Sequence, residues 1–214
     1  MKKPIIIILL VAILFIAGVF IIRRNNSGTS TDQEETQNVP DLPVDQRPIA
    51  MLIPKSDGHW LTLKVEGIKV PGAVSMDYEL LYKANNGQAV TTQGVPGTVQ
   101  LKGLTSVSRD LLLGSESSGK FRYDKDVENG TLTIRFRDGS GKLLGKVMTD
   151  WHLQTSTTVL TSVDGSFKYT LDKAATGVWF VTMQSFGNAV GANVVVYSNG
   201  WAIFSSDGLT HTGK

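Results

Sequence analysis

The chain has 214 residues, a formal net charge of +2 and no cysteine. Without cysteine it has no disulfide, no thiolate zinc site and no cysteine nucleophile. Lysine and arginine are interspersed with acidic residues, which argues against a nucleic-acid groove because phosphate affinity comes from clustered basic side chains. The length suffices for one domain, or two small ones, after an N-terminal segment.

The first element is an uncharged, almost wholly apolar run from Ile5 to Ile22. As a helix it would be roughly 27 Å long, close to the hydrocarbon core of a bilayer at about 30 Å. A cleaved signal peptide is the competing interpretation, but the run is longer than a usual signal-peptide core and lacks a small-x-small cleavage pattern. We therefore expect residues 1–24 to be a single-pass transmembrane signal-anchor that contacts the lipid bilayer through residues 5–22.

The short N-terminal flank of the apolar run is too small to hold a domain, so the domain lies on the side of the membrane that the C-terminal part of the chain reaches. Basic residues lie at both ends of the apolar run, so the positive-inside rule gives only a slight preference. We expect a cytoplasmic N-terminus and an extracytoplasmic C-terminal domain; a cytoplasmic domain is the alternative. Residues 25–48 are polar and contain three prolines, which predicts a disordered tether.

Several segments after residue 48 alternate apolar and polar residues with period two, which predicts β-strands with one buried face. They are residues 61–66, 78–82, 131–137 and 167–171. Residues 178–183 and 194–197 are apolar at successive positions, which predicts strands that are covered on both faces or lie near an interface. Residues 105–113 fit either a short helix or a loop followed by a strand.

Asn-Gly and Asp-Gly pairs punctuate these segments and predict tight turns, because glycine adopts positive φ freely. The predicted turns are Asp57-Gly58, Asn86-Gly87, Asn129-Gly130, Asp138-Gly139, Asp164-Gly165, Asn199-Gly200 and Asp207-Gly208. One predicted meander runs through residues 121–127, turns at Asn129-Gly130, and continues through residues 131–137 and 142–149.

Many short strands without βαβ spacing predict an all-β fold, an antiparallel immunoglobulin-like sandwich that follows the single transmembrane helix. Residues 49–153 would form one β-sandwich domain. Residues 154–214 would form a second, smaller β unit, or additional strands of the same domain.

The segment from Thr161 to Leu171, followed by Thr176 to Val181, carries a resemblance to a known family. Its Asp-Gly turn and the aromatic residue that begins the next strand resemble the repeating hairpin of bacterial surface immunoglobulin-like and fibronectin type III-like modules. The resemblance covers about 20 residues and implies a stalk, spacer or binding module. It implies no shared catalytic residues.

Trp60 and Trp201 are the candidate ligand residues. Buried tryptophan is the commoner fate, but both residues follow predicted turns and are therefore the tryptophans expected to be partly exposed. Together or separately they could form a platform for a carbohydrate or a peptide.

Two motifs resemble ligand loops without matching them. Asp124, Asp126 and Glu128 form a D-x-D-x-E run, but Arg135 stands where a calcium loop needs a bidentate glutamate. The run from Gly139 to Lys142 lacks the preceding glycine and the following serine or threonine of a phosphate loop. We expect no metal site and no cofactor.

The sequence therefore predicts a non-catalytic protein with a binding, adhesion or structural role in the cell envelope, partnered by an envelope protein or glycan and not by nucleic acid. The alternative is an extracytoplasmic hydrolase or glycan-processing enzyme. It requires His152, or acids such as Asp77, Glu79 and Asp150, to converge in a cleft. A subunit of a surface assembly is a third possibility, although the usual pilin leader is missing from the sequence.

Overall fold

The structure is a computed structural model that describes residues 39–85, 87, 89–186, 195–196 and 200–214. The chain divides into two compact units, Met1–Val39 and Pro40–Lys214, and the second unit is called the body below. The expected anchor, and the expected tether as far as residue 38, lie outside the described residues. Within the described residues, no helix is long and apolar enough to cross a membrane.

Strands make up most of the body, and one short 3-10 helix precedes them. In the described residues these elements are η2 (Val44–Gln46), β1 (Ile49–Pro54), β2 (Trp60–Glu66), β3 (Ser75–Asn85), β4 (Val90–Gln100), β5 (Ser106–Leu112), β6 (Gly114–Ser117), β7 (Lys120–Tyr123), β8 (Asn129–Arg137), β9 (Leu143–Thr155), β10 (Val159–Thr161), β11 (Lys168–Thr170), β12 (Trp179–Gln184), β13 (Val195–Val196) and β14 (Trp201–Ser205). Residues 105–113, which fitted a helix or a strand, contain the strand β5.

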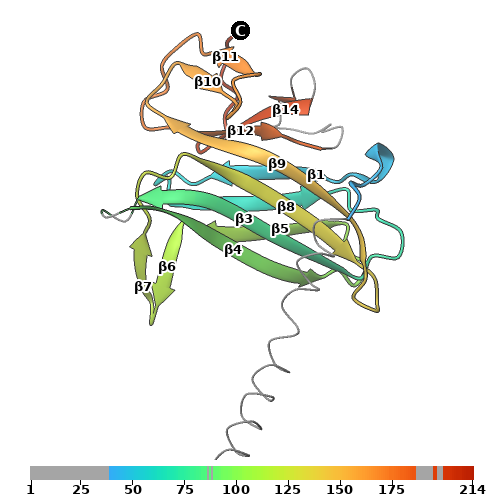
Figure 1. Cartoon of the computed structure of the whole chain (residues 1–214). Helices are drawn as coiled ribbons and strands as arrows, with labels where there is room; N and C mark the ends of the chain where they lie inside the picture. The colour runs from blue at the N-terminus through green and yellow to red at the C-terminus, as the bar shows by residue number, and fades with distance from the viewer. Residues whose placement is uncertain (1–38, 86, 88, 187–194, 197–199) are drawn as a thin grey trace, which may run out of the picture. The chain divides into compact units, whose positions relative to one another are not determined.

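The paired strands are antiparallel and confirm the predicted all-β antiparallel class. Within the described residues, a large sheet has the order β13-β14-β12-β9-β8-β3-β4 and a small sheet has the order β1-β2-β5 (Figure 1). Two separate hairpins, β6–β7 and β10–β11, accompany them. Strands from the C-terminal part of the chain, β12 and β14, thus extend the same sheet that contains β8 and β9.

Alternation along each strand explains which face is buried. On β8, Leu132, Ile134 and Phe136 are fully buried, whereas Arg135 and Arg137 lie on the opposite, partly exposed face. Side chains of successive residues in a strand point to opposite faces, so this pattern gives the sheet one apolar side.

One hydrophobic core lies between the two sheets. Both sheets contribute fully buried side chains to it, and burial of this apolar surface stabilises the two-layered arrangement. The contributors include Leu52, Leu61, Leu63 and Leu111 from the small sheet and Met76, Leu80, Phe136, Trp151 and Met183 from the large sheet.

A second, smaller cluster explains the predicted double burial of residues 178–183. On β12, Val181 and Met183 belong to the main core. Phe180 faces the other way and packs with Leu160 and Tyr169 of the β10–β11 hairpin. The prediction of a strand covered on both faces is confirmed.

The body begins before β1, inside the segment expected to be tether. The backbone N–H of Leu42 donates to Lys146 C=O (2.8 Å), and the N–H of Lys146 donates to Pro40 C=O (3.2 Å). The Leu42 side chain is buried against Gly145, where a Cβ would lie 2.5 Å from Leu42 Cδ2. Residues 40–42 are therefore clipped onto β9.

Several predicted turns are confirmed. Asp57-Gly58 connects β1 to β2, and Gly58 has a φ of +70°. Asp138-Gly139 begins the turn from β8 to β9, where the Asp138 carboxylate accepts the backbone N–H groups of Ser140 (2.9 Å) and Lys142 (3.0 Å).

The turn predicted at Asn129-Gly130 is wrong, because both residues lie within β8. Gly130 pairs with Tyr82 on β3 and with Trp151 on β9. A Cβ on Gly130 would lie 1.9 Å from the carbonyl oxygen of Leu81. The glycine therefore permits close approach of two strands. The predicted meander is wrong at the same point, since β7 pairs with β6 and not with β8.

Candidate functional site

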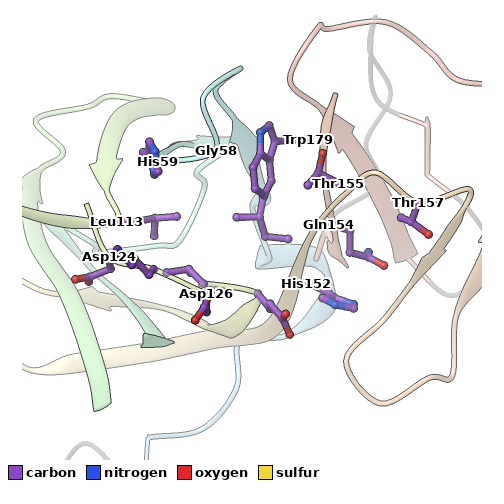
Figure 2. A pocket seen from close by; sticks show the side chains of 14 residues that line it. Gly58, His59, Leu113, Asp124, Asp126, His152, Gln154, Thr155, Thr157 and Trp179 are labelled. Carbon is purple, nitrogen blue, oxygen red and sulfur yellow. The ribbon is translucent and has the colours of Figure 1, made fainter. Parts of the chain in front are cut away.

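A cavity of about 600 Å³ lies at one end of the two-layered body. It is formed where several strands begin or end: the turn before β2, the end of β5, the connection between β7 and β8, the end of β9 and the start of β12. Its lining residues are Gly58, His59, Leu113, Asp124, Lys125, Asp126, Val127, Glu128, His152, Leu153, Gln154, Thr155, Thr157 and Trp179 (Figure 2).

The connection between β7 and β8 forms one wall of this cavity. Its backbone is fixed at both ends: Asp124 N–H donates to Leu113 C=O (3.0 Å), and Glu128 C=O accepts the N–H of Leu153 (2.6 Å). Between them, Asp126 has a φ of +54°, a left-handed conformation that aspartate tolerates better than most residues. The D-x-D-x-E run is therefore a fixed wall that carries three carboxylates.

Two of these carboxylates accept hydrogen bonds from β3. Tyr82 Oη donates to Asp124 Oδ2 (2.9 Å), and Asn85 Nδ2 donates to Asp126 Oδ2 (3.0 Å). Burial, and then the hydrogen bond to Asp124, raise the pKa of Tyr82 well above its usual range, so the phenol stays a donor. Among the described residues, no ion pair involves Asp124, Asp126 or Glu128.

The same carboxylates were considered as calcium ligands. In the described part of the chain, no three histidine, aspartate or glutamate side chains are grouped so that they could hold a metal ion.

His152 and Gln154 line the cavity from β9 and hold the β10–β11 hairpin. His152 Nδ1 lies 2.8 Å from Thr161 C=O; a carbonyl only accepts, so Nδ1 carries the proton. Gln154 Nε2 donates to the same carbonyl (3.1 Å), and Gln154 Oε1 accepts the N–H of Thr161 (3.0 Å). In the neutral imidazole, Nε2 of His152 is then an acceptor.

Four aromatic rings contact one another in a row that reaches the cavity at His59, and they are called the aromatic row: His59, Trp60, Phe121 and Tyr123. His59 stacks on Tyr123 with ring centroids 4.1 Å apart, and Phe121 lies parallel to Tyr123 at 6.4 Å. Trp60 meets Phe121 edge to face at 5.6 Å. Because His59 also lines the cavity, the row continues its wall.

The row is open to solvent on the β6–β7 hairpin. Phe121 is 48% exposed and Tyr123 is 39% exposed. The two residues alternate with Lys120 and Arg122 on β7, so both rings lie on the same face of the hairpin. This alternation of aromatic and basic residues is the sequence signal that could have identified them.

Trp201 lies in a different aromatic contact. Its ring stacks on Phe167 with centroids 5.5 Å apart, and Phe167 packs against the second hydrophobic cluster. Trp60 and Trp201 are both half-buried, and the structure does not bring them into one site. A ligand role for either residue stays a prediction.

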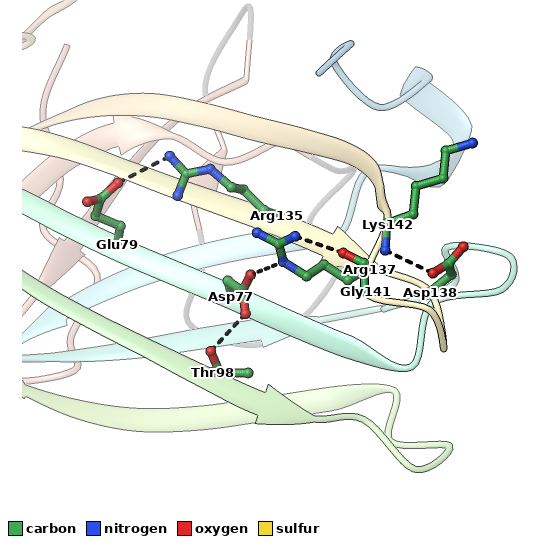
Figure 3. Close-up of polar contacts among 8 residues, drawn as sticks. All are labelled: Asp77, Glu79, Thr98, Arg135, Arg137, Asp138, Gly141 and Lys142. Atoms are coloured by element: carbon green, nitrogen blue, oxygen red, sulfur yellow. Dashed lines mark hydrogen bonds and ion pairs between the residues drawn. The ribbon is translucent and has the colours of Figure 1, made fainter. Parts of the chain in front are cut away.

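The acids considered for catalysis are distributed over the sheet. Asp77 accepts from Arg137 Nε (2.6 Å) and from Thr98 Oγ1 (2.8 Å), whereas Glu79 accepts from Arg135 Nη2 (3.1 Å) (Figure 3). They lie on β3, and neither lines the cavity. Asp150 accepts from Thr131 Oγ1 (3.1 Å) on the neighbouring strand. Of these acids and His152, the cavity lining contains His152 alone among the described residues.

Comparison of the chain with protein-family models, with curated proteins and with solved structures found no match.

Proposed function

We propose that this chain is a membrane-anchored, extracytoplasmic binding protein of the cell envelope that has no catalytic step of its own. Residues 5–22 insert into the lipid bilayer with the N-terminus in the cytoplasm, and the body carries its ligand site outside. The proposal includes the immunoglobulin-like character expected from the sequence. Two packed antiparallel sheets with loops gathered at one end support it.

The single observation that carries the binding role is the aromatic row, which meets the cavity at His59. Large apolar rings grouped at a surface cost free energy in water and mark interaction sites. Phe121 and Tyr123 remain exposed together, beside a cavity whose volume lies within the roughly 300–1,000 Å³ typical of ligand pockets. A ligand that fills the cavity and extends past His59 would reach Tyr123, on which His59 stacks.

The alternative proposal, a hydrolase or glycan-processing enzyme, draws on His152. This histidine lines the cavity, and the bond from Nδ1 to Thr161 leaves Nε2 as the basic nitrogen. A general base needs such a fixed tautomer within reach of its substrate. In the described residues, the hydrogen bonds of this ring run to Thr161 and not to a carboxylate, so we place the binding role first.

Envelope retention tests the binding role. Full-length protein in detergent micelles is mixed with envelope material from the source organism that has been stripped of lipid by detergent, and the material is sedimented. We expect the wild-type protein in the pellet and the Phe121→Ala/Tyr123→Ala double variant in the supernatant, because the stacking surface is lost.

Leu209→Ala is the control, because it removes an exposed apolar side chain that belongs to neither the cavity lining nor the aromatic row, and it should sediment like the wild type. Equal sedimentation of the wild type and the double variant would contradict the assignment of the site. The supernatants also test the alternative: steady release of soluble fragments by the wild type, but not by His152→Gln, would favour the enzyme.

A further inference from the structure

We infer that the ligand of the cavity is a carbohydrate of the envelope, whose sugar rings stack on the aromatic row while their hydroxyl groups bond to the carboxylate wall. This inference rests on the proposed binding function and specifies its ligand class. Three features of the site lead to it: the orientation of the rings, the kind of polar groups in the wall, and the state of the wall's backbone.

The aromatic row has two partly exposed rings, Phe121 and Tyr123, and His59 stacks on one face of Tyr123. Tyr123 and Phe121 are parallel within 2°, and each keeps more than a third of its surface exposed. A pyranose ring has an apolar face of C–H groups that packs against an aromatic ring, while its hydroxyls point outward around the edge. Parallel rings on one short strand therefore suit a ligand with repeated, similar faces.

The wall of the cavity offers mostly acceptors. Asp124 and Asp126 each accept one hydrogen bond from β3, and an ionised carboxylate has room for about four. Thr155 Oγ1 donates to Val178 C=O (3.0 Å) and so presents its lone pairs as an acceptor. Lys125 adds an ammonium donor among the lining residues. A sugar hydroxyl both donates and accepts, so it can bond to both kinds of group.

A peptide is the less suitable ligand because several backbone groups of the wall are already paired within the protein. Extended peptides are commonly held by main-chain hydrogen bonds to an open strand edge. Here the backbone of the wall is already bonded to its neighbours: Asp124 to Leu113, Lys125 to Asn85, and Glu128 to Leu153. The carboxylate oxygens of the wall and the exposed rings of Phe121 and Tyr123 are therefore the groups that we assign to the ligand, and both kinds of group bind sugars.

Selective destruction of the envelope material tests the inference. One sample of lipid-stripped envelope is treated with periodate, which cleaves vicinal diols, and another is digested with protease. We expect full-length protein to sediment with the protease-treated sample and to lose retention on the periodate-treated sample.

The converse result, retention that survives periodate and is lost after protease, would overturn the carbohydrate and leave the binding function standing. If retention survives both treatments, the material is digested with a muramidase, because 1,4-linked N-acetyl amino sugars have no vicinal diol for periodate to cleave. Retention that also survives this digestion would overturn the carbohydrate. If untreated envelope failed to retain the protein, the binding function itself would fail, so the two failures are distinguishable.

Single variants connect the result to the site. Tyr123→Ala and Phe121→Ala should each weaken retention by about tenfold, because a stacked ring is lost. Leu209→Ala, which lies outside the cavity lining and the aromatic row, should stay within about twofold of the wild type. Thermal unfolding checks that each variant is folded. Phe121 is the more exposed of the two residues, so Phe121→Ala still tests the site if Tyr123→Ala is unstable. Unchanged retention in both folded alanine variants would overturn the inference.

Discussion

Gly58 touches the indole ring of Trp179 at the turn between β1 and β2. A Cβ at Gly58 would lie 2.4 Å from Trp179 Cε2, and the residue also has a φ of +70°. The turn therefore needs glycine for two reasons, one conformational and one steric. Trp179 lines the cavity beside Gly58, so the contact also fixes a cavity wall.

We expect Gly58→Ala to lower the free energy of unfolding by about 2–4 kcal/mol, the sum of a left-handed alanine and an overpacked contact. Gly165→Ala is the matched control: Gly165 has a φ of +71° but no atom near the position of a Cβ. The control should cost only about 1–2 kcal/mol. Urea unfolding of both variants measures the difference, and equal losses would contradict the role of the Trp179 contact.

The C-terminal tail is hydrogen-bonded to the β10–β11 hairpin, which covers β12. The N–H of Lys214 donates to Thr170 C=O (2.9 Å), and the N–H of Thr170 donates to Lys214 C=O (2.7 Å). Asp207 pairs with His211 at 3.1 Å, and the edge of the His211 ring meets Phe180. These contacts join the tail to the second hydrophobic cluster.

This tail should weaken in acid. Burial raises the pKa of Asp207, but hydrogen bonds from Leu209 N–H and from the side chains of Ser205 and His211 outweigh it and hold the pKa below its usual 3.8. A lowered folded-state pKa gives stability that is complete above the unfolded value and is lost as pH falls through the folded value.

Asp207→Asn should therefore be less stable than the wild type near neutral pH, by about 1 kcal/mol or less, and the difference should shrink as the pH falls below the usual aspartate value of 3.8. Urea midpoints across this pH range provide the measurement. A difference that persists unchanged in acid would show that the carboxylate charge is not responsible.

Element types were predictable wherever a local pattern decides them. The alternation of apolar and polar residues identified β8, and apolar residues at successive positions identified β12. Both patterns are visible in the sequence because neighbouring residues of a strand point to opposite faces. Asn129-Gly130 misled the prediction because the same dipeptide serves either a turn or a close approach between strands. Only the neighbouring Leu81 carbonyl distinguishes the two, and it is remote in the sequence.

The candidate site was predictable only in part. Trp60 was identified from its place beside a turn, but His59, Phe121 and Tyr123 were not. Their association depends on the β6–β7 hairpin lying against the turn before β2, a contact between distant segments. The D-x-D-x-E run was recognised as a motif in the sequence. Its position in the same cavity as the turn before β2 could be found only from the fold.

The proposed envelope location can be tested directly on intact cells. We expect external protease to remove a short epitope placed after Lys214 from intact cells that express the full chain, while a cytoplasmic marker survives. The physical reason is that an apolar run long enough to span the bilayer leaves the C-terminal part beyond it. An epitope that is protected in intact cells and cleaved only after lysis would contradict the proposed orientation.

The clip of residues 40–42 onto β9 has a mechanical consequence for a body held at its N-terminal end. Tension on the chain ahead of residue 40 would load the Pro40–Lys146 and Leu42–Lys146 bonds before it reached β1. Leu42 would have to leave its contact with Gly145 before the sandwich began to open. The contacts of residues 40–42 would therefore break first, before the pulling force reached the strands of the two sheets.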